Sequence, residues 1–449
     1  MQTFDPQSLL AVLNPQLPAD FSGQFCVAFS GGLDSSVLLH ALTELRAGHP
    51  EWSVRALYVD HQLQVASATW GERCQAVAQK LNVEFAILKV DVDRDSDEGL
   101  ESAARTARYS ALRQALRPNE ILLTAHHADD QAETVLMALL RGSGVQGLAA
   151  MPVRKAWAPG WHMRPLLAFT RNELAKWARE QGINGIDDPT NQVLRHDRNF
   201  LRHEVLPLLA GRWPAAASSI ARGADHAGES LALLEEIAQA DLGACGVGPA
   251  LRIEALLALS GPRRRNLVRF WLRSQGLRMP STRKLAGLEV DLRVAAQHRI
   301  PTVRWLDVEL FWHRGLLYAR SEQPAVPAEM SWQWREPLRL PALGVLSLGP
   351  ALVGLATEKL PETLTVRFRA GGERIRLPGR EHRHHLKNLL QESDVLPWWR
   401  DRLPLLFVGK KLAAVGDLFV SDEFIARDGQ RASSVVWSGA PAWRAAYAP

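Results

Sequence analysis

Short apolar runs alternate with longer amphipathic stretches through the first half of the chain. The runs are rich in β-branched and aromatic residues, as strands buried on both faces of a sheet are, and they lie at 25–29, 54–59, 85–92 and 120–125. Between them, apolar residues recur at helical spacing over 35–45, 68–81, 100–116 and 129–140. This alternation predicts a doubly wound α/β domain, in which right-handed crossovers join the strands of a parallel sheet and helices cover both faces.

A different pattern begins after residue 212. Helices rich in alanine, leucine and glutamate are expected at 218–240 and 262–275, whereas the sequence from about residue 300 is strand-like and rich in tryptophan. Beyond a stretch rich in proline and glycine, alternating residues and one helix near 384–393 indicate a small α+β domain. The predicted parts are therefore an α/β domain at 1–212, a mostly helical domain at 213–336, a linker with short strands at 337–361 and a C-terminal domain at 362–449.

The composition is that of a globular protein. With 449 residues, 47% of them hydrophobic and 22% charged, the chain has room for two or three domains. The first residues lack the pattern of a signal peptide, and prolines and glycines interrupt the longest uncharged stretch, 340–357. No membrane helix is therefore expected, and the cytosol is the default location. The three cysteines form no CxxC pair, which argues against a disulfide framework or a thiolate metal cluster.

The positive charge is concentrated in the last part of the chain. The formal net charge is +5, yet residues 365–411 alone contain eleven lysines and arginines against five acidic residues. A local basic excess of this kind predicts an anionic partner, and nucleic acid is the first candidate. An ordinary solvated surface is the alternative.

The stretch SGGLDSS, residues 30–36, directly follows the first predicted strand. Its two glycines allow the backbone to approach a phosphate closely, and the successive N–H groups and the start of the next helix favour an anion. Ser30 and Ser35 add donors, and Asp34 is a candidate Mg²⁺ ligand. The stretch lacks the Lys-Ser/Thr ending of a Walker A loop. It therefore indicates a different kind of phosphate loop, with a plain strand-to-helix turn as the alternative.

A second polar stretch, TAHHADDQAET, begins at Thr124 at the end of the fourth predicted strand. Asp130 and Glu133 are three residues apart at the start of a helix, so they share a face. Because the carboxyl ends of parallel strands meet at one edge of a sheet, this stretch is expected to lie beside the phosphate loop. Helix capping is the alternative for the carboxylates, and a hydrogen-bonded structural role is an equal alternative for His126 and His127.

Two further stretches carry arginines. Arg105 lies in GLESAARTARY, where it is placed to reach phosphates, although its spacing from Glu101 by itself favours a surface ion pair. The stretch DDPTNQVLRHDRNFLR, which begins at residue 187, combines a turn with Arg195, Arg198 and Arg202. A turn followed by a solvated helix explains the second stretch equally well.

Taken together, these stretches resemble a known family. The similar pieces are SGGLDS, HHADDQAET followed by RGSGVQGLAAM, RPLL at 164–167, DDPTN with RNFLR, and the C-terminal GGERIR, LKNLLQ and PWWRDRLPLLF. They are similar to the corresponding pieces of bacterial tRNA(Ile)-lysidine synthetases, whose SGGxDS motif is the PP-loop of the ATP pyrophosphatases. The resemblance covers nearly the whole chain and is weakest from about 290 to 360.

The resemblance implies an activity and roles for individual residues. Such enzymes use ATP and Mg²⁺ to attach L-lysine to C2 of the wobble cytidine in the CAU anticodon of an isoleucine tRNA. The cytidine is adenylated, AMP and pyrophosphate leave, and the codon read changes from AUG to AUA. The resemblance assigns ATP to Ser30, Gly31, Gly32, Leu33, Asp34 and Ser35, with Mg²⁺ on Asp34. It assigns the lysine ammonium to Asp130 and Glu133, one of them as base, and the charge developing at the α-phosphate to Arg105 and Arg198.

The later domains would then bind the tRNA. The candidate contacts are Arg374, Arg376, Arg380, Lys387, Trp398 and Arg400. Trp398 is a candidate for stacking on a base because basic residues follow it, with a place in the protein core as the alternative. The run of residues 382–385, HRHH, is interpreted as facing RNA rather than a metal ion. The sequence leaves the oligomeric state open, a homodimer included.

Two other functions fit parts of the pattern. A PP-loop enzyme that thiolates tRNA would adenylate a similar carbonyl, but such chemistry usually calls for paired cysteines, which this sequence lacks. A non-catalytic tRNA-binding protein with a relic nucleotide loop would bind RNA with a steep salt dependence and release no pyrophosphate.

Overall fold

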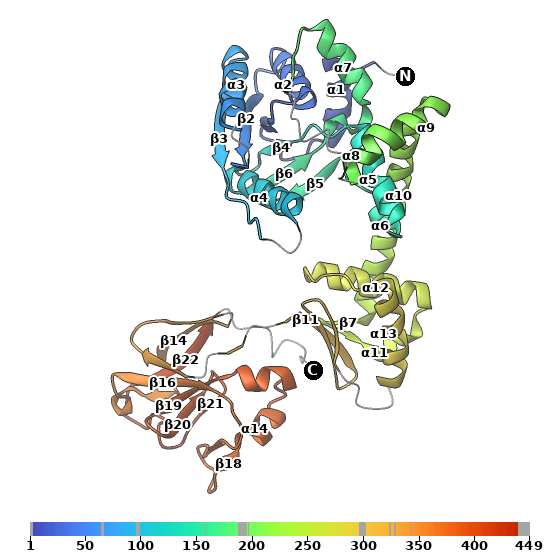
Figure 1. The fold of residues 1–449 in the computed structure, drawn as a ribbon. Coiled ribbons are helices and arrows are strands. Elements are labelled where there is room, and N and C mark those ends of the chain that lie inside the picture. Colours follow the sequence, from blue (N-terminus) through green and yellow to red (C-terminus); the bar gives the residue numbers. More distant parts are fainter. Residues whose placement is uncertain are drawn as a thin grey trace. The chain divides into compact units, whose positions relative to one another are not determined.

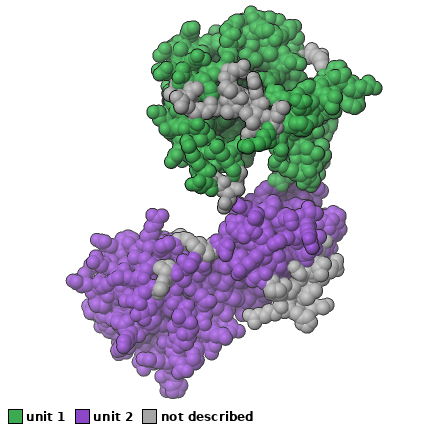
Figure 2. Space-filling model, viewed as in Figure 1, with its two compact units in different colours: residues 1–233 green, residues 234–449 purple. Residues whose placement is uncertain are grey.

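The computed structural model of the chain consists of two compact units, residues 1–233 and 234–449 (Figure 2). It describes residues 3–63, 67–95, 99–157, 159–186, 195, 197–295, 302–322, 325–326, 329–341 and 343–438. The turn DDPTN therefore lies outside the described residues. The boundary expected at 212/213 falls just before the long helix α10 (Ala216–Cys245), whereas the two units divide within that helix.

The first unit is built on a six-stranded sheet with the order β3-β2-β1-β4-β6-β5. The strands are β1 (Gln24–Ala28), β2 (Ser53–Asp60), β3 (Glu84–Lys89), β4 (Ile121–Leu123), β5 (Arg154–Trp157) and β6 (Gly160–Met163). All pairs are parallel except the edge pair β5–β6, which is antiparallel. The predicted fold class is thus confirmed, and the four expected strands are present. The edge hairpin was not foreseen, because two four-residue strands give too short a pattern.

Helices cover both faces of this sheet. Helices α2 (Leu33–Arg46) and α3 (Ser67–Lys80) lie on one face and α4 (Leu100–Ala115) on the other (Figure 1). Alternation along β1 explains the two layers: Phe25 and Val27 pack with the α2 and α3 side chains, whereas Cys26 packs with Leu112 of α4. The remaining helices of this unit are α1 (Pro6–Leu13), α5 (Ala128–Leu140), α6 (Val145–Leu148), α7 (Arg171–Glu180), α8 (Asp197–Phe200) and α9 (Leu206–Arg212).

The strand order reverses at β1, which lies between β2 and β4. The loops that follow β1 and β4 therefore leave the sheet at the same carboxyl edge, at the point where ligands bind in open α/β sheets. The first of these loops is the glycine-rich stretch, and the second leads into α5. The fold thus brings together the two polar stretches that lie about a hundred residues apart in sequence.

The second unit starts with a mixed layer rather than a purely helical domain. Helices α11 (Ile253–Ala258), α12 (Gly261–Ser274) and α13 (Thr282–Ala295) share a core with an antiparallel sheet of order β7-β8-β11-β10-β9. Its strands are β7 (Gly246–Val247), β8 (Ala250–Arg252), β9 (Val303–Trp305), β10 (Val308–His313) and β11 (Leu316–Ser321). Strands β9, β10 and β11 lie in the strand-like sequence expected from about residue 300, whereas β7 and β8 were not expected, because they are very short and come before the helices. Among the described residues, no helix of the chain is long and apolar enough to cross a membrane.

The stretch expected to be a linker with short strands does contain strands, and they form a sheet with the end of the described chain. Strand β14 (Gly344–Ala351) lies between β13 (Leu338–Leu340) and β22 (Ala432–Ser438), and β22 also pairs with β15 (Leu355–Ala356). The proline and glycine content of this stretch suggested a linker. Its pairing could not be predicted, because its partner strand lies some eighty residues further along the chain. The C-terminal domain therefore includes the residues that were expected to lead into it.

The rest of the second unit is a second antiparallel sheet of order β12-β16-β19-β20-β21 with one helix, α14 (Leu386–Glu392). The strands are β12 (Glu329–Gln333), β16 (Thr363–Phe368), β19 (Pro404–Val408), β20 (Lys411–Val415) and β21 (Phe419–Val420), with a small hairpin of β17 (Arg374–Ile375) and β18 (His384–His385). The helix lies close to the expected position. A core that includes Trp332, Leu386 and Trp437 joins the sheets of this C-terminal part.

A buried ion pair ties the α4 face of the first sheet together. Arg55 of β2 donates from Nε and Nη2 to the two carboxylate oxygens of Glu120, both at 2.6 Å, and Nη2 also donates to the carbonyl of Ala115. Glu120 is only 1% exposed and Arg55 is 8% exposed. Removing one partner of such a pair leaves the other charge buried without compensation.

We expect Glu120→Gln to lower the free energy of unfolding of the first unit by about 3 kcal/mol, because Arg55 keeps its buried charge and loses the opposite one. Urea denaturation followed by tryptophan fluorescence measures this. The matched control is Glu51→Gln, which changes an exposed carboxylate beside His49 and should leave the unfolding midpoint unchanged. Equal midpoints for the two variants would show that the buried pair adds nothing to stability.

Candidate active site

The glycine-rich loop after β1 is shaped to bind an anion. Gly31 has a φ of +80°, a conformation that favours glycine, and Gly32 caps α2 without a side-chain hydrogen bond to the first turn. The hydroxyl of Ser35 donates to the carbonyl of Gly32 at 2.9 Å and lies 3.2 Å from the hydroxyl of Ser30. The backbone N–H groups at the start of α2 therefore remain available to a ligand, and the helix dipole favours a negative one.

Two segments that the sequence analysis did not single out hold this loop in place. The N–H of Ile186 donates to the carbonyl of Gly31 at 2.8 Å. A Cβ on Gly31 would lie 2.6 Å from the Ile186 side chain and 2.7 Å from the sulfur of Cys74, and a Cβ on Gly185 would lie 2.4 Å from the N of Leu33. The loop is thus packed against neighbouring backbone as tightly as glycine permits. Gly185 and Ile186 could have indicated this contact in the sequence, but a glycine at such a position is typical of an ordinary turn.

A slot of about 280 Å³ opens beside the loop, between the ends of β1 and β2 and the helix α4. Its walls combine apolar and aromatic side chains with polar groups, as in many small-molecule sites. Residues from the loop, from β2 and from α4 line it, including Ser30, Gly32, Tyr58, His61, Trp70 and Arg108.

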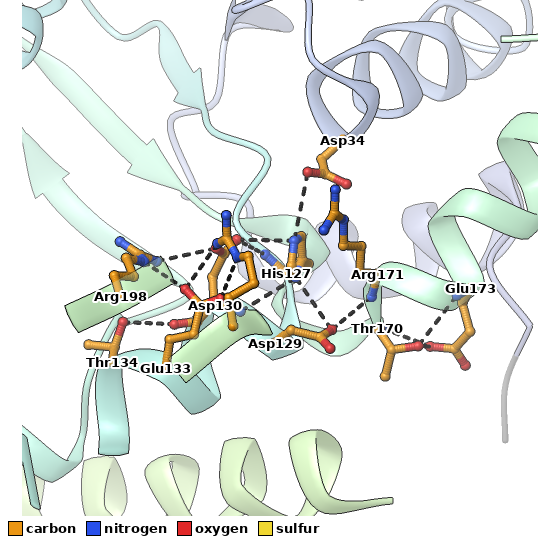
Figure 3. Close-up of polar contacts among 11 residues, drawn as sticks. Asp34, His127, Asp129, Asp130, Glu133, Thr134, Thr170, Arg171, Glu173 and Arg198 are labelled. Atoms are coloured by element: carbon orange, nitrogen blue, oxygen red, sulfur yellow. Dashed lines mark hydrogen bonds and ion pairs between the residues drawn. The ribbon is translucent and has the colours of Figure 1, made fainter. Parts of the chain in front are cut away.

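His127 links the glycine-rich loop to the second polar stretch (Figure 3). Its ring is buried, and its Nε2 lies 3.7 Å from Asp34 at the start of α2 and 3.4 Å from Asp130 in α5. Its Nδ1 lies 3.4 Å from Asp129, which also accepts a hydrogen bond from the N–H of Arg171 at 2.8 Å. A single imidazole therefore lies among three carboxylates.

Two arginines neutralise the carboxylates that were expected to share a helix face. Arg198 donates from Nε to Glu133 at 2.6 Å and from Nη2 to Asp130 at 3.2 Å. Arg202 donates from Nε to Glu133 at 2.6 Å and from Nη2 to Asp130 at 2.7 Å. Glu133 is completely buried, whereas the side chain of Asp130 is 11% exposed. The expected shared face is present, but in this structure arginines of the same chain occupy it.

The charges of this cluster change its pKa values. Burial would raise the pKa of Asp130, but the charges of His127, His126, Arg198 and Arg202 lower it to about 2. Burial would lower the pKa of His127, but the hydrogen bond to Asp129 and the charges of Asp130 and Asp34 raise it above its ordinary value. The site therefore contains ionised Asp130 beside a histidine that binds a proton more readily than an ordinary imidazole.

The negative charge of Asp34 is only partly balanced by the groups around it. Burial raises its pKa, and the charge of His127 only partly offsets this effect. Its Oδ1 is buried and has no hydrogen-bond partner in the described part of the chain. An unsatisfied carboxylate oxygen beside an anion-binding loop fits a divalent cation, which prefers oxygen ligands.

Arg105 lies apart from the carboxylate cluster. It is exposed on α4, and its guanidinium stacks over the ring of Tyr109 at 5.1 Å from the ring centre. Its charge nevertheless acts on His126 and on His162, so it faces the same end of the sheet. Arg105 is thus near the site without forming part of the ion-pair cluster.

The basic residues of the second unit surround a separate hollow of about 820 Å³. Arg374 and Arg376 line it, and Arg376 forms an ion pair with Asp422. The cationic residues along its wall are Lys359, Arg374, Arg376, Arg383, Lys410, Lys411 and Arg427. Arg380 lies 3.8 Å from Glu392, and Lys387 is exposed on α14. These candidates for phosphate contact thus lie at the surface.

Trp398 differs from its expected role. Its ring stacks on Phe311 with the ring centres 4.5 Å apart and meets Tyr318 edge-on, so it packs against the core of the second unit. The neighbouring Trp399 is buried, and Nε of Arg400 donates to the carbonyl of Val395. The core alternative therefore describes these tryptophans better than base stacking, because Phe311 of β10 and Tyr318 of β11 pack against the Trp398 ring.

The sequence analysis also left the partner of Glu133 unidentified. Arg202 was noted after the turn but given no role, although it lies one helical turn after Arg198 and reaches the same two carboxylates. The spacing of four residues was a usable signal for a shared face. The residues that this face contacts could not be predicted, because sequence alone does not show which helix faces α5.

Comparisons with known proteins match three stretches of the chain to family models. Residues 4–209 match the family model of a PP-loop domain, residues 251–318 that of a TilS substrate binding domain, and residues 364–437 that of a TilS substrate C-terminal domain. The first unit, with its glycine-rich loop at the switch point of the sheet, is thus a PP-loop domain.

Curated relatives identify the family within this class. The tRNA(Ile)-lysidine synthase of Coxiella burnetii is 40% identical over 429 residues, which cover 94% of each chain. That of Alkalilimnicola ehrlichii is 42% identical, again over 94% of each chain, and that of Pseudomonas putida is 44% identical over 87% of this chain and 92% of the relative. The chain belongs to the tRNA(Ile)-lysidine synthase family.

We expect Gly185→Ala to reduce ATP affinity by about tenfold or more, because the new Cβ would displace the backbone of Leu33 in the PP-loop. Isothermal titration with MgATP measures the affinity. Gly211→Ala is the matched control, since a Cβ there meets open space. Unchanged ATP affinity in the Gly185 variant would contradict the close packing of the loop.

Proposed function

We propose that this chain ligates L-lysine to C2 of the wobble cytidine of a CAU-anticodon isoleucine tRNA, with cleavage of ATP to AMP and pyrophosphate. The observation that carries the proposal is the direct link, through His127, between the PP-loop residue Asp34 and the carboxylate cluster of α5. It supports a single site in which a nucleotide phosphate and a cationic substrate meet. Family membership supplies the particular tRNA, and the tRNA substrate favours the cytoplasm as the place of the reaction.

ATP is required because the C2 carbonyl oxygen of cytosine is a poor leaving group. Attack of that oxygen on the α-phosphate expels pyrophosphate and makes the oxygen part of an AMP leaving group. The residues from Ser30 to Ser35 would hold the phosphates through the loop N–H groups and the start of α2. Arg105 and Arg198 would stabilise the charge that develops at the α-phosphate.

Lysine binding would use the cluster of Asp130 and Glu133 through an exchange of cations. The lysine ammonium would replace Arg198 at Asp130, where the bond of 3.2 Å is the longest of the cluster. Arg202 would stay on Glu133, which is completely buried. The exchange supports both assigned roles of Arg198, since the arginine that leaves Asp130 becomes available to the phosphate.

The same exchange would turn Asp130 into a better base. A free lysine amine has a pKa of about 10.4, so the ammonium must lose a proton before the nitrogen attacks C2. A carboxylate with a pKa of about 2 is a weak proton acceptor. Departure of the Arg198 charge would raise that pKa toward the ordinary value, and Asp130 is the partly exposed member of the pair.

Mg²⁺ fits the residues of the loop. The unsatisfied, buried Oδ1 of Asp34 would be its protein ligand, and the ion would neutralise charge on the ATP phosphates.

The second unit would bind the body of the tRNA. The surface candidates that would contact phosphates are Arg374 and Arg376, which line the basic hollow, and the exposed Arg380 and Lys387. Arg400 is partly buried and bonded to backbone, so it would contribute mainly through its charge. The anticodon loop would bind at the catalytic domain, because an unpaired base leaves its stack at the lowest cost in free energy.

The thiolation alternative lacks a reactive sulfur. All three cysteines are buried, and burial raises the pKa of Cys26 and of Cys74 to about 12. A thiol in that state is a poor nucleophile at neutral pH. The Cys74 sulfur instead packs beneath Gly31 of the loop.

The proposed activity predicts lysine-dependent labelling of tRNA. With ATP and Mg²⁺, purified protein should transfer labelled lysine to a transcript of the isoleucine tRNA with a CAU anticodon, with equal release of AMP and pyrophosphate. Asp34→Asn should lower the rate by about 10²-fold or more, because Asp34 is the assigned ligand of the ion that neutralises the phosphates. Asp20→Asn, at an exposed turn, is the control and should retain the wild-type rate. Tight tRNA binding without label would support the non-catalytic alternative.

The cation exchange predicts opposite effects of two substitutions on lysine. Asp130→Asn should raise the KM for lysine about 10- to 100-fold, the range expected for losing a charged hydrogen-bond partner. Arg198→Met should lower kcat but leave the KM for lysine unchanged or reduced, because it removes the competitor at Asp130. Steady-state kinetics at saturating ATP and tRNA give both constants. An increase in the lysine KM of equal size in the two variants would rule out the exchange.

A further inference from the structure

A chain of hydrogen bonds runs through the floor of the site, beneath the ion-pair cluster. Nη2 of Arg164 lies 3.4 Å from Nδ1 of His162, Nε2 of His162 lies 2.9 Å from the hydroxyl of Thr124, and that hydroxyl lies 2.9 Å from Nδ1 of His126. Arg164, His162 and Thr124 are each less than 10% exposed, whereas His126 is partly exposed. The hydrogen-bond chain thus runs from the interior to the site, in the order Arg164, His162, Thr124 and His126.

The backbone of the sheet brings these four side chains together. His162 lies in β6, which pairs with β4 in parallel, and the N–H of Thr124 donates to the carbonyl of Met163 at 3.1 Å. Thr124 and His126 follow directly after β4, two residues apart, so both side chains leave the strand on the same side. Nη1 of Arg164 donates to the carbonyl of Pro152 at 2.9 Å, which anchors the inner end.

The directions of the first two hydrogen bonds follow from the arginine, and the third follows because His162 and His126 are the partners of the Thr124 hydroxyl among the described residues. An arginine guanidinium only donates, so Nδ1 of His162 accepts and its proton lies on Nε2. That Nε2–H donates to the oxygen of Thr124. The single hydroxyl proton of Thr124 is then directed to Nδ1 of His126. His126 accepts at Nδ1, and its own proton lies on Nε2.

The surroundings favour the neutral form of both rings, which this arrangement requires. Burial and the charge of Arg164 lower the pKa of His162 to about 2. Burial lowers the pKa of His126 to about 3, although the charge of Asp130 opposes it. The charges that act on His126 are those of Asp130, Arg164, Arg198 and Arg105. Protonation of His162 would also place its Nδ1–H donor against the Arg164 donor.

We propose that Arg164, acting through His162 and Thr124, fixes the tautomer of His126, so that His126 presents a neutral Nε2–H donor to a phosphate oxygen of the bound nucleotide. The inference rests on the proposed function for the identity of the anion. Nε2 of His126 has no hydrogen-bond partner among the described residues, and the next residue, His127, contacts Asp34 of the PP-loop.

A neutral donor suits this reaction better than a charged one. It stabilises the charge developing on the phosphate without forming an ion pair with Asp130 next to it, and it needs no reorganisation when the charge appears. Arg164, His162 and Thr124 are positioning residues in this scheme, because they act through His126. The RPLL stretch noted in the sequence thereby gains a role, since Arg164 is its first residue.

The first test is the tautomer itself, measured on the wild-type protein labelled with ¹⁵N-histidine. Long-range ¹H–¹⁵N spectra of the full chain at neutral pH should show His126 and His162 with a protonated Nε2 and a bare Nδ1. A proton on Nδ1 of His126 would overturn the proposal. This measurement does not depend on any activity, so it separates failure of the hydrogen-bond chain from failure of the proposed function.

The second test uses the hydroxyl at the centre of the chain. Thr124→Val keeps the shape but breaks the chain, so AMP release should slow by about 10²-fold while the KM for lysine stays the same, and the ¹⁵N spectra should show both tautomers of His126. Thr124→Ser keeps the hydroxyl and should rescue the rate. Thr43→Val, which removes a half-buried hydroxyl bonded to the carbonyl of Leu39, is the control and should have no effect. A Thr124→Val enzyme with the wild-type rate, or a Ser variant as slow as the Val variant, would overturn the proposal.

Discussion

The site depends on how the charges around Asp130 and Glu133 are compensated. Two carboxylates at the start of one helix would repel each other and would be costly to bury, yet Glu133 is completely removed from solvent. Arg198 and Arg202 make that burial possible, and they come from a segment that follows the parallel sheet in sequence. Formation of the site therefore requires α8 and the π-helical turn Leu201–Val205 to dock on α5.

This compensation also accounts for the division of labour between the two carboxylates. Glu133 accepts from both arginines at short distances and behaves as a structural anchor. Asp130 accepts one short and one longer bond and retains some exposure. Residues of the same chemical type, one helical turn apart, therefore differ in their freedom to exchange partners. Burial and partner geometry, rather than residue type, separate them.

The sequence was sufficient for the features that depend on local pattern. The alternation of apolar runs predicted the parallel sheet and its helices, and the glycine-rich loop and the Asp130 cluster were placed at one edge from strand direction alone. The features it could not supply depend on pairing over long distances. Arg202 contacts Asp130 and Glu133 only when the π-helical turn Leu201–Val205 docks on α5. The pairing of β14, in the expected linker with short strands, could not be predicted because its partner β22 lies far along the chain. The packing of Trp398 on Phe311 is another contact between residues far apart in sequence, which the local pattern could not show.

The pairing of β14 with β22 has a consequence for how the protein is made. Strand β14 lies between β13 and β22, and every residue from Val345 to Ala351 has its partner in β22. During synthesis, the whole sheet from β16 to β21 emerges before β22 exists, so β14 must wait with one edge unpaired. The PP-loop domain is complete long before that point. A ribosome-bound chain can therefore hold a finished catalytic sheet while its basic C-terminal domain is still open, and only synthesis through residue 438 joins the two functions in one molecule.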